Sequence, residues 1–224
     1  MSEAGRIFRK AKACFDRPTV LKYKAGFELL KQAALLGEVG AHEWLGAAYD
    51  YGLGTRPNRR RAFEHYLKAA KAGDANSEYH VGIFYFRGYG VRKSRRLAAK
   101  WLRRSVKHGD PYAMHVLGKH YRYGQGVGKD SAKGFSLQLR AAKRGVVEAQ
   151  FSVGVCLSKG EGTRSDPRQA FRWYLRAARR GHDDAAYNLG YFYATGRGVR
   201  RDSRKSQLWY ARADALSKKT GQST

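Results

Sequence analysis

The sequence has few cysteines and no long apolar run, and each shortage excludes a class of protein. Two cysteines, Cys14 and Cys156, cannot form the dense disulfide framework of a small secreted scaffold, so we expect a reducing compartment, the cytoplasm. No apolar run approaches about 18 residues, which argues against a membrane-spanning helix. The first residues, MSEAGRIFRKAKACFD, contain neither the apolar core nor the cleavage site of a secretory signal. We therefore expect a soluble cytoplasmic protein.

Acidic residues are scarce relative to basic ones. The chain of 224 residues contains 18 Asp and Glu against 45 Lys and Arg, which gives a formal net charge of +27. Such an excess raises the affinity for anionic partners, whether nucleic acid, an acidic protein or an anionic membrane surface. The hydrophobic content of 42% argues against disorder, and the length is sufficient for a substantial core. Composition thus predicts a folded basic protein without identifying its partner.

The motifs of common catalytic sites are missing as well. The sequence contains no G-x-S-x-G and no H-x-x-x-H, and His115 and His120 have a spacing that points them to different sides of a helix. One segment, YGQGVGKD at 123–130, resembles a glycine-rich phosphate-binding loop, although Asp130 stands where that motif has Ser or Thr. Whether it is a nucleotide site depends on whether the segment is unique in the chain.

It is not unique, because a glycine pair with the same spacing recurs every 36 residues. The segments are YGLGT at 51–55, RGYGV at 87–91, YGQGV at 123–127, KGEGT at 159–163 and TGRGV at 195–199. Gly128 and Lys129, which suggested the phosphate loop, have no counterpart in the other four copies. We therefore interpret the glycines as left-handed positions at the ends of helices.

Other positions keep the same period and predict two helices in each repeat. A polar residue suited to cap a second helix stands at Asn58, Ser94, Asp130, Asp166 and Asp202. The expected first helices are 41–51, 77–87, 113–123, 149–159 and 185–195. The expected second helices are 58–72, 94–108, 130–144, 166–180 and 202–217. Repeats of this length bury their apolar faces by stacking, so the fold class is an all-α solenoid of five 36-residue helix hairpins.

The flanking segments depart from the repeat. A helix over about residues 19–36 is expected to cap the first hairpin, which makes 19–217 the solenoid. Residues 1–18 match the pattern poorly and are expected to form an irregular N-terminal cap, and 218–224 a mobile tail. Because Cys14 and Cys156 lie several repeats apart, we do not expect them to form a disulfide.

These columns resemble the Sel1-like repeat, a relative of the tetratricopeptide repeat. The segment AAYNLGYFYATGRGVRRDSRKSQLWYARA, residues 185–213, has that family's small residue, Leu-Gly, Tyr, G-x-G-V and Asp at the expected spacings. FRWYLRAARRGH, residues 171–182, is similar to its second half. The resemblance covers about residues 20–217. It implies a right-handed α-solenoid whose first helices line a concave face, and an adaptor or scaffold rather than a catalyst.

In the tetratricopeptide-like register, the concave face collects aromatic and basic residues. It comprises Tyr51, Tyr79, Phe86, Arg87, His115, Lys119, Arg122, Tyr123, Phe151, Lys159, Tyr187 and Tyr191. Rings supply apolar area and Arg or Lys pairs with carboxylates, so the face suits an extended peptide with acidic residues. Tyr79, Phe151 and Tyr187 share one column and are equally interpretable as packing residues of the repeat. Arg87, Lys119 and Arg122 carry charges, which rarely lie in a core.

The second helices predict another surface, a basic ridge on their outer side. Its residues are Arg60, Lys68, Arg96, Arg104, Arg140, Arg168, Arg176, Arg204 and Arg212. Their spacing puts them on one helix face. Solvated faces usually mix Lys with Glu, whereas Glu64 is nearly alone here.

Together these patterns favour a non-catalytic adaptor that binds an acidic protein or peptide, with no cofactor or metal. The alternative is sequence-independent nucleic-acid binding through the ridge. An anionic membrane surface is a third alternative, for which the ridge offers little apolar surface to insert. The oligomeric state stays open, because Leu208, Trp209 and Leu216 suit either an end-to-end neighbour or closure of the stack.

Overall fold

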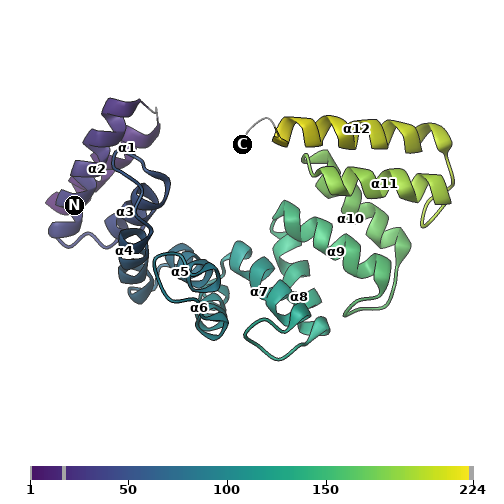
Figure 1. Cartoon of the computed structure of the whole chain (residues 1–224), viewed down its shortest axis with the longest axis horizontal. Coiled ribbons are helices and arrows are strands. Elements are labelled where there is room, and N and C mark those ends of the chain that lie inside the picture. The colour runs from purple at the N-terminus through teal and green to yellow at the C-terminus, as the bar shows by residue number, and fades with distance from the viewer. Residues whose placement is uncertain (1, 17–18, 222–224) are drawn as a thin grey trace. The chain divides into compact units, whose positions relative to one another are not determined.

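The computed structural model describes residues 2–16 and 19–221, and these ranges form helices without any strand (Figure 1). The helices are α1 (Glu3–Asp16), α2 (Val20–Leu35), α3 (Gly40–Tyr51), α4 (Arg59–Lys71), α5 (Ala75–Arg87), α6 (Arg95–Lys107), α7 (Pro111–Tyr123), α8 (Ser131–Lys143), α9 (Val147–Lys159), α10 (Pro167–Arg179), α11 (Asp183–Thr195) and α12 (Ser203–Gly221). None of these helices is long and apolar enough to cross a bilayer.

The chain divides within α7 into two compact units, Met1–Ala113 and Met114–Thr224. In the first unit α1 to α6 follow one another in chain order, each packed on the next (Figure 1). In the second unit α8 to α12 do the same. Each unit is therefore a stack of helix hairpins. The predicted helices are confirmed to within about two residues at their ends, except that the last helix continues four residues beyond its predicted end.

The predicted caps begin the second helices. The Asn58 Oδ1 accepts a hydrogen bond of 3.0 Å from the Arg61 N–H, and the other four cap positions make the same contact. The first helices begin up to two residues earlier than expected. Side-chain caps accompany the earlier start at Asp74, Asp110 and His182: Asp74, for example, accepts from the Ser77 N–H at 2.6 Å. Val39 and Val146, at the same repeat position, make no side-chain cap.

The glycine pairs join consecutive hairpins. The first glycine ends a helix in the left-handed region, as Gly52 does with φ 73°. The second glycine approaches the backbone at the start of the preceding second helix: a Cβ on Gly90 would lie 2.5 Å from the Arg59 carbonyl, and one on Gly162 would overlap that of Ser131. A Cβ on Gly128, by contrast, would meet no atom within 4 Å. The recurring glycines are joints between repeats, as the period predicted.

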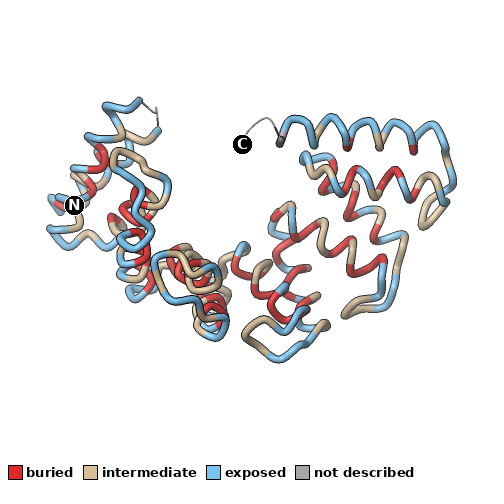
Figure 2. Tube along the Cα trace, in the orientation of Figure 1, coloured by how far each residue is buried: buried red, intermediate tan, exposed pale blue. Residues whose placement is uncertain are grey.

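The core of each unit lies between the paired helices, where the buried residues gather (Figure 2). Aromatic rings of the second helices cover glycines of the first, since a Cβ on Gly46 would lie 2.7 Å from the Tyr66 ring. Tyr174 covers Gly154 in the same way. Cys156 is buried in the second unit, where burial raises the pKa of its thiol to about 11, and Cys14 is half-buried in the first; both are free.

The expectation of an irregular N-terminal segment was wrong for residues 3–16, which form α1. Its buried or half-buried residues, among them Ala4, Phe8 and Ala11, recur at helical spacing and pack on α2. The 36-residue alignment missed this helix because the segment lacks the repeat's glycine and tyrosine columns. Helix α12 continues to Gly221, so the expected tail is helical over 218–221. Residues 1, 17–18 and 222–224 lie outside the described residues.

Candidate interaction surface

The second unit exposes aromatic and basic side chains on its first helices. Tyr123 near the end of α7 is 56% exposed, and Tyr187 and Tyr191 on α11 are 58% and 44% exposed. Lys119 and Lys159 are exposed on α7 and α9. None of these five side chains belongs to an ion pair among the described residues. They are therefore accessible to a ligand, and together we call them the tyrosine–lysine face.

The first unit exposes fewer of the predicted residues. Tyr51 is 66% exposed at the end of α3, and Arg87 is exposed at the end of α5. Each is the last residue of its helix and is followed by a left-handed glycine. Phe86 and Tyr79 are half-buried. The solvent-accessible part of the predicted face in this unit is consequently small.

One column of the predicted face has a packing role. The Phe151 ring stacks on His182 with centroids 4.4 Å apart and contacts Tyr174 at 5.9 Å. The Tyr79 ring lies 5.2 Å from His80. Tyr187 contacts Tyr210 at 5.0 Å but remains more than half exposed. The column therefore packs inside the repeats at Phe151 and Tyr79 and reaches solvent at Tyr187.

Arg122 differs from its prediction as a ligand-binding cation. The side chain is 5% exposed, and its Nη2 lies 2.6 Å from the Glu161 Oε2 while its Nε donates to the Glu161 Oε1 at 3.2 Å. The pair joins α7 to the loop after α9. The Arg122 charge is neutralised by Glu161 and is not available to a ligand, because a buried guanidinium requires a carboxylate partner. This pair was not predicted from the sequence. Glu161 stands between the two loop glycines Gly160 and Gly162, and an acidic residue at that position of a strongly basic chain is a signal that could have indicated it.

His115 contributes no charge to the face at neutral pH. Burial, with a smaller effect of Lys119, lowers the pKa of its imidazole to about 4. Its Nδ1 is buried without a hydrogen-bond partner among the described residues. His120, on the same helix, is 1% exposed. His120 is therefore a core side chain of the second unit, whereas His115 is half-buried and uncharged at neutral pH.

The basic ridge is uneven along the second helices. In the first unit the Arg104 Nε donates to the Glu78 Oε1 at 2.8 Å, and the His108 Nδ1 lies 2.8 Å from the Glu78 Oε2. Glu78 is 0% exposed, so Arg104 neutralises a buried carboxylate. Arg60 pairs with Glu64 at 3.3 Å on the surface. Both ridge residues therefore have an acidic partner within the chain. The sequence did not indicate the pairing of Arg104 with Glu78, because the two residues are 26 positions apart.

On α10 the ridge borders a hollow. A cleft of about 430 Å³ is lined by Asp166, Arg168, Gln169, Arg172, Trp173 and Arg176. The guanidinium of Arg176 lies 4.6 Å from the Trp173 ring centroid, and the same stack joins Arg212 to Trp209 at 5.2 Å on α12. Arg168 and Arg176 were predicted as ridge residues, whereas Arg172, Gln169 and Trp173 were not. The hollow and its guanidinium groups come from one exposed helix face.

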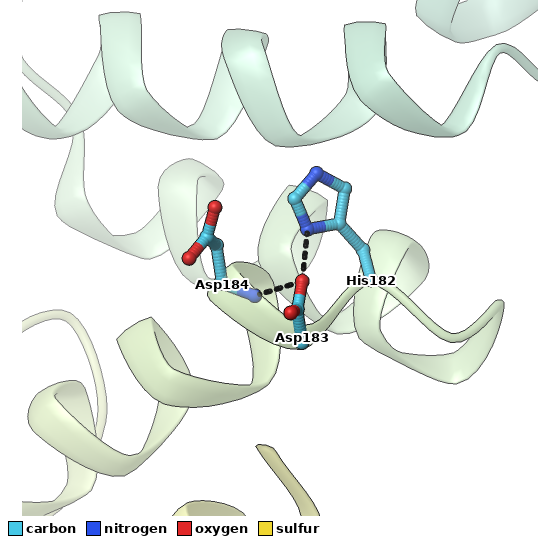
Figure 3. Close-up of side chains that lie close together, drawn as sticks. All are labelled: His182, Asp183 and Asp184. Atoms are coloured by element: carbon cyan, nitrogen blue, oxygen red, sulfur yellow. Dashed lines mark hydrogen bonds and ion pairs between the residues drawn. The ribbon is translucent and has the colours of Figure 1, made fainter. Parts of the chain in front are cut away.

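A group of His182, Asp183 and Asp184 lies at the start of α11 (Figure 3). The His182 Nδ1 accepts a hydrogen bond from the Ala185 N–H at 3.4 Å. It also lies 3.8 Å from the Asp183 Oδ1, to which the Asp184 N–H donates at 2.9 Å (Figure 3). The group thus caps a helix N-terminus, where the helix dipole favours carboxylates and disfavours a cation. Its geometry is explained by capping.

The Sel1 repeat family model matches six consecutive segments of the chain. The matched segments are residues 19–38, 39–74, 75–110, 111–146, 147–182 and 183–213. The chain belongs to the Sel1-repeat family. The first match covers only α2, so the predicted N-terminal capping helix is the second half of a Sel1 repeat. The other matches coincide with the period seen in the sequence.

Two solved structures share the Sel1-repeat fold over most of the chain. The protein c5321, a protective antigen of uropathogenic Escherichia coli strains with an SLR fold, matches 95% of this chain with a TM-score of 0.88 and 25% identity. A Sel1 repeat protein from Oxalobacter formigenes matches 93% of this chain and 84% of its own length, with a TM-score of 0.84 and 28% identity. The chain spans 46% of the length of the E. coli protein. The predicted all-α solenoid is confirmed.

A third structure shares the fold alone. The immunity protein Pa5087 from Pseudomonas aeruginosa matches 96% of this chain and 83% of its own length, with a TM-score of 0.58 and 19% identity. No curated protein sequence matches the chain. Sel1-repeat proteins generally mediate protein–protein interactions and are generally not enzymes. Family membership therefore supports binding to a protein.

Proposed function

We propose that this Sel1-repeat chain is a non-catalytic scaffold that binds an extended acidic segment of a partner protein on its first helices. The observation that carries the proposal is the tyrosine–lysine face of the second unit. It presents three exposed tyrosines and two exposed lysines, and neither lysine forms an ion pair among the described residues. Tyrosine rings supply rigid apolar contact area, and unpaired lysines favour carboxylates on the partner.

The rest of the chain supports an acidic partner over a basic one. The net charge of +27 attracts acidic proteins and repels basic ones at long range. Arg122 is not part of the proposed site, because it is buried and paired with Glu161. Lys119 and Lys159 then carry the charge recognition in the second unit.

A peptide-display selection on the purified chain tests this proposal. Selected peptides are expected to be enriched in Asp and Glu with interspersed apolar residues. Their affinity, measured by fluorescence anisotropy, is expected to fall at least about tenfold in the variant Lys119→Glu/Lys159→Glu. The variant Tyr123→Ala/Tyr191→Ala should weaken the same peptides comparably, because the rings are expected to be the apolar anchors.

The matched control is Arg6→Glu/Lys10→Glu on α1, which makes the same charge change on exposed residues of the other unit. Selection of neutral or basic peptides would contradict the acidic partner. Equal loss in the control and in Lys119→Glu/Lys159→Glu would show that net charge, and not the face, determines binding.

A further inference from the structure

The cleft on α10 differs in chemistry from the tyrosine–lysine face. Arg168, Arg172 and Arg176 are exposed, and none of them takes part in an ion pair of the described residues. The one acidic residue of the lining, Asp166, has a lowered pKa because its carboxylate accepts from the Gln169 backbone N–H and side chain. That carboxylate is therefore committed to capping α10.

The three arginines are regularly spaced. Residues four apart on a helix lie on one face and rise by about 6 Å, so the row extends over about 12 Å. The Arg176 guanidinium makes a cation–π contact with the Trp173 ring, 4.6 Å from its centroid, and this contact restricts the arginine rotamers before any ligand binds. The row is a linear array of guanidinium groups on a rigid support.

Other repeats show that this array is particular to α10. The equivalent positions are Arg60, Glu64 and Lys68 in α4, Ala132, Ser136 and Arg140 in α8, and Arg204, Leu208 and Arg212 in α12. In α6 they are Arg96, Lys100 and Arg104, but Arg104 is bound to Glu78. Among the described second helices, three unpaired arginines in this register therefore occur on α10.

The cleft contains no exposed apolar anchor. Trp173 is 8% exposed because Arg176 and neighbouring side chains cover it. Protein interfaces depend on desolvated aromatic or aliphatic anchors, which this lining does not offer. A nucleic-acid backbone binds largely through its phosphates and the release of counterions, for which guanidinium groups are sufficient. The lining thus fits a chain of phosphates better than a protein segment.

We infer that the α10 cleft binds the phosphate backbone of a nucleic acid through Arg168, Arg172 and Arg176, without reading the sequence. This inference is independent of the proposed peptide site, which lies on the first helices. It also narrows the predicted ridge, because Arg60 and Arg104 have internal acidic partners. Bases are not expected to stack here, since the indole of Trp173 is covered.

The test uses the full chain and fluorescein-labelled mixed-sequence oligonucleotides, single-stranded and duplex, in anisotropy titrations from about 50 to 200 mM salt. The variant Arg168→Ala/Arg172→Ser gives α10 the residues that α8 has at the same repeat positions. Its affinity near 50 mM salt is expected to fall about 10- to 100-fold, and the slope of log K against log salt to decrease by about 2. The control Arg6→Ala/Lys10→Ser removes the same charge from α1.

Several results would overturn the inference. The inference is wrong if the wild-type protein binds neither oligonucleotide at about 50 mM salt. It is also wrong if the α10 variant and the α1 control lose affinity equally. A poly-glutamate peptide of equal charge that binds as tightly as the oligonucleotides, with the same dependence on Arg168 and Arg172, would assign the cleft to an acidic protein instead. Circular dichroism and thermal unfolding of both variants establish that each is folded. Peptides selected on the tyrosine–lysine face should bind the α10 variant normally.

Discussion

The Arg122 Nη2 lies 2.6 Å from the Glu161 Oε2 and joins α7 to the loop that follows α9, 39 residues further along the chain. Arg122 is 5% exposed, whereas Glu161 is about one-third exposed. The carboxylate therefore neutralises a guanidinium that could not otherwise remain buried. This contact holds together two consecutive repeats of the second unit.

Glu161→Gln is expected to destabilise the second unit by about 1–3 kcal/mol, because it leaves the Arg122 charge buried without a counter-ion. The hydrogen bond from Arg122 lowers the pKa of Glu161 below its ordinary value of 4.5. The pair's contribution is thus present above pH 4.5 and is lost as the pH falls through the lowered pKa. Urea unfolding at several pH values should show that the variant lacks this acid dependence. Asp214→Asn, an exposed acid on α12, is the control, and an equal effect there would contradict the assignment.

Two glycines that look alike in the sequence should respond differently to alanine. Gly162→Ala is expected to cost about 3 kcal/mol or more, since φ is 71° and the new Cβ would overlap the Ser131 carbonyl. Gly128→Ala should be neutral or stabilising by up to about 1 kcal/mol, because the site is open and has no positive φ. Denaturant midpoints of the two variants measure the difference. A large loss for Gly128→Ala would contradict the open environment of that glycine.

The buried carboxylate of Glu78 should make the loss of its partners costly. Arg104→Met/His108→Leu is expected to destabilise the first unit by about 3 kcal/mol at pH 7, because the carboxylate is left buried and unpaired. Adding Glu78→Met should recover most of this loss, since Met114 occupies the equivalent position one repeat later and is itself fully buried. Chemical unfolding of the double and triple variants tests the idea. A triple variant no more stable than the double would rule it out.

Half-buried histidines should make both units less stable in mild acid. Burial lowers the pKa of His80 in the first unit and His115 in the second to about 4, from an ordinary value of 6.5. The unfolded chain therefore binds more protons than the folded chain, and stability falls as the pH drops from 6.5 towards 4.

Histidine proton resonances followed by NMR against pH give the two pKa values directly. Replacing His80 or His115 by Leu should flatten the pH dependence of unfolding in its own unit. A resonance that titrates near 6.5 would contradict the burial effect for that histidine.

The repeat period made most of the fold predictable. Residues such as Asn58 and Gly52 act through local backbone geometry, so their column alone indicates a cap or a helix end. Helix α1 was missed because its helical spacing of apolar residues does not follow the repeat columns.

The candidate surfaces were less predictable, because availability depends on contacts between distant residues. Arg122 and Arg87 are both basic and both near the end of a first helix, yet one is buried against Glu161 and the other is exposed. Arg104 and Arg176 share a column, but only Arg104 faces a buried carboxylate. Sequence columns identify which side chains occupy a helix face, whereas the rare acidic residues decide which cations remain unpaired.

The contact of each second loop glycine with the preceding repeat also limits how such a chain can change in length. Gly198 meets the backbone at Pro167 as Gly162 meets it at Ser131, and the two positions are equivalent. Removing residues 147–182 would bring Gly198 onto Ser131 and preserve the joint. A deletion within the repeats that is not a whole multiple of 36 residues would shift the loop glycines out of step, and a side chain would stand where only a hydrogen fits. Evolution or design can therefore shorten or extend this molecule by whole repeats, each of which brings its own pair of loop glycines.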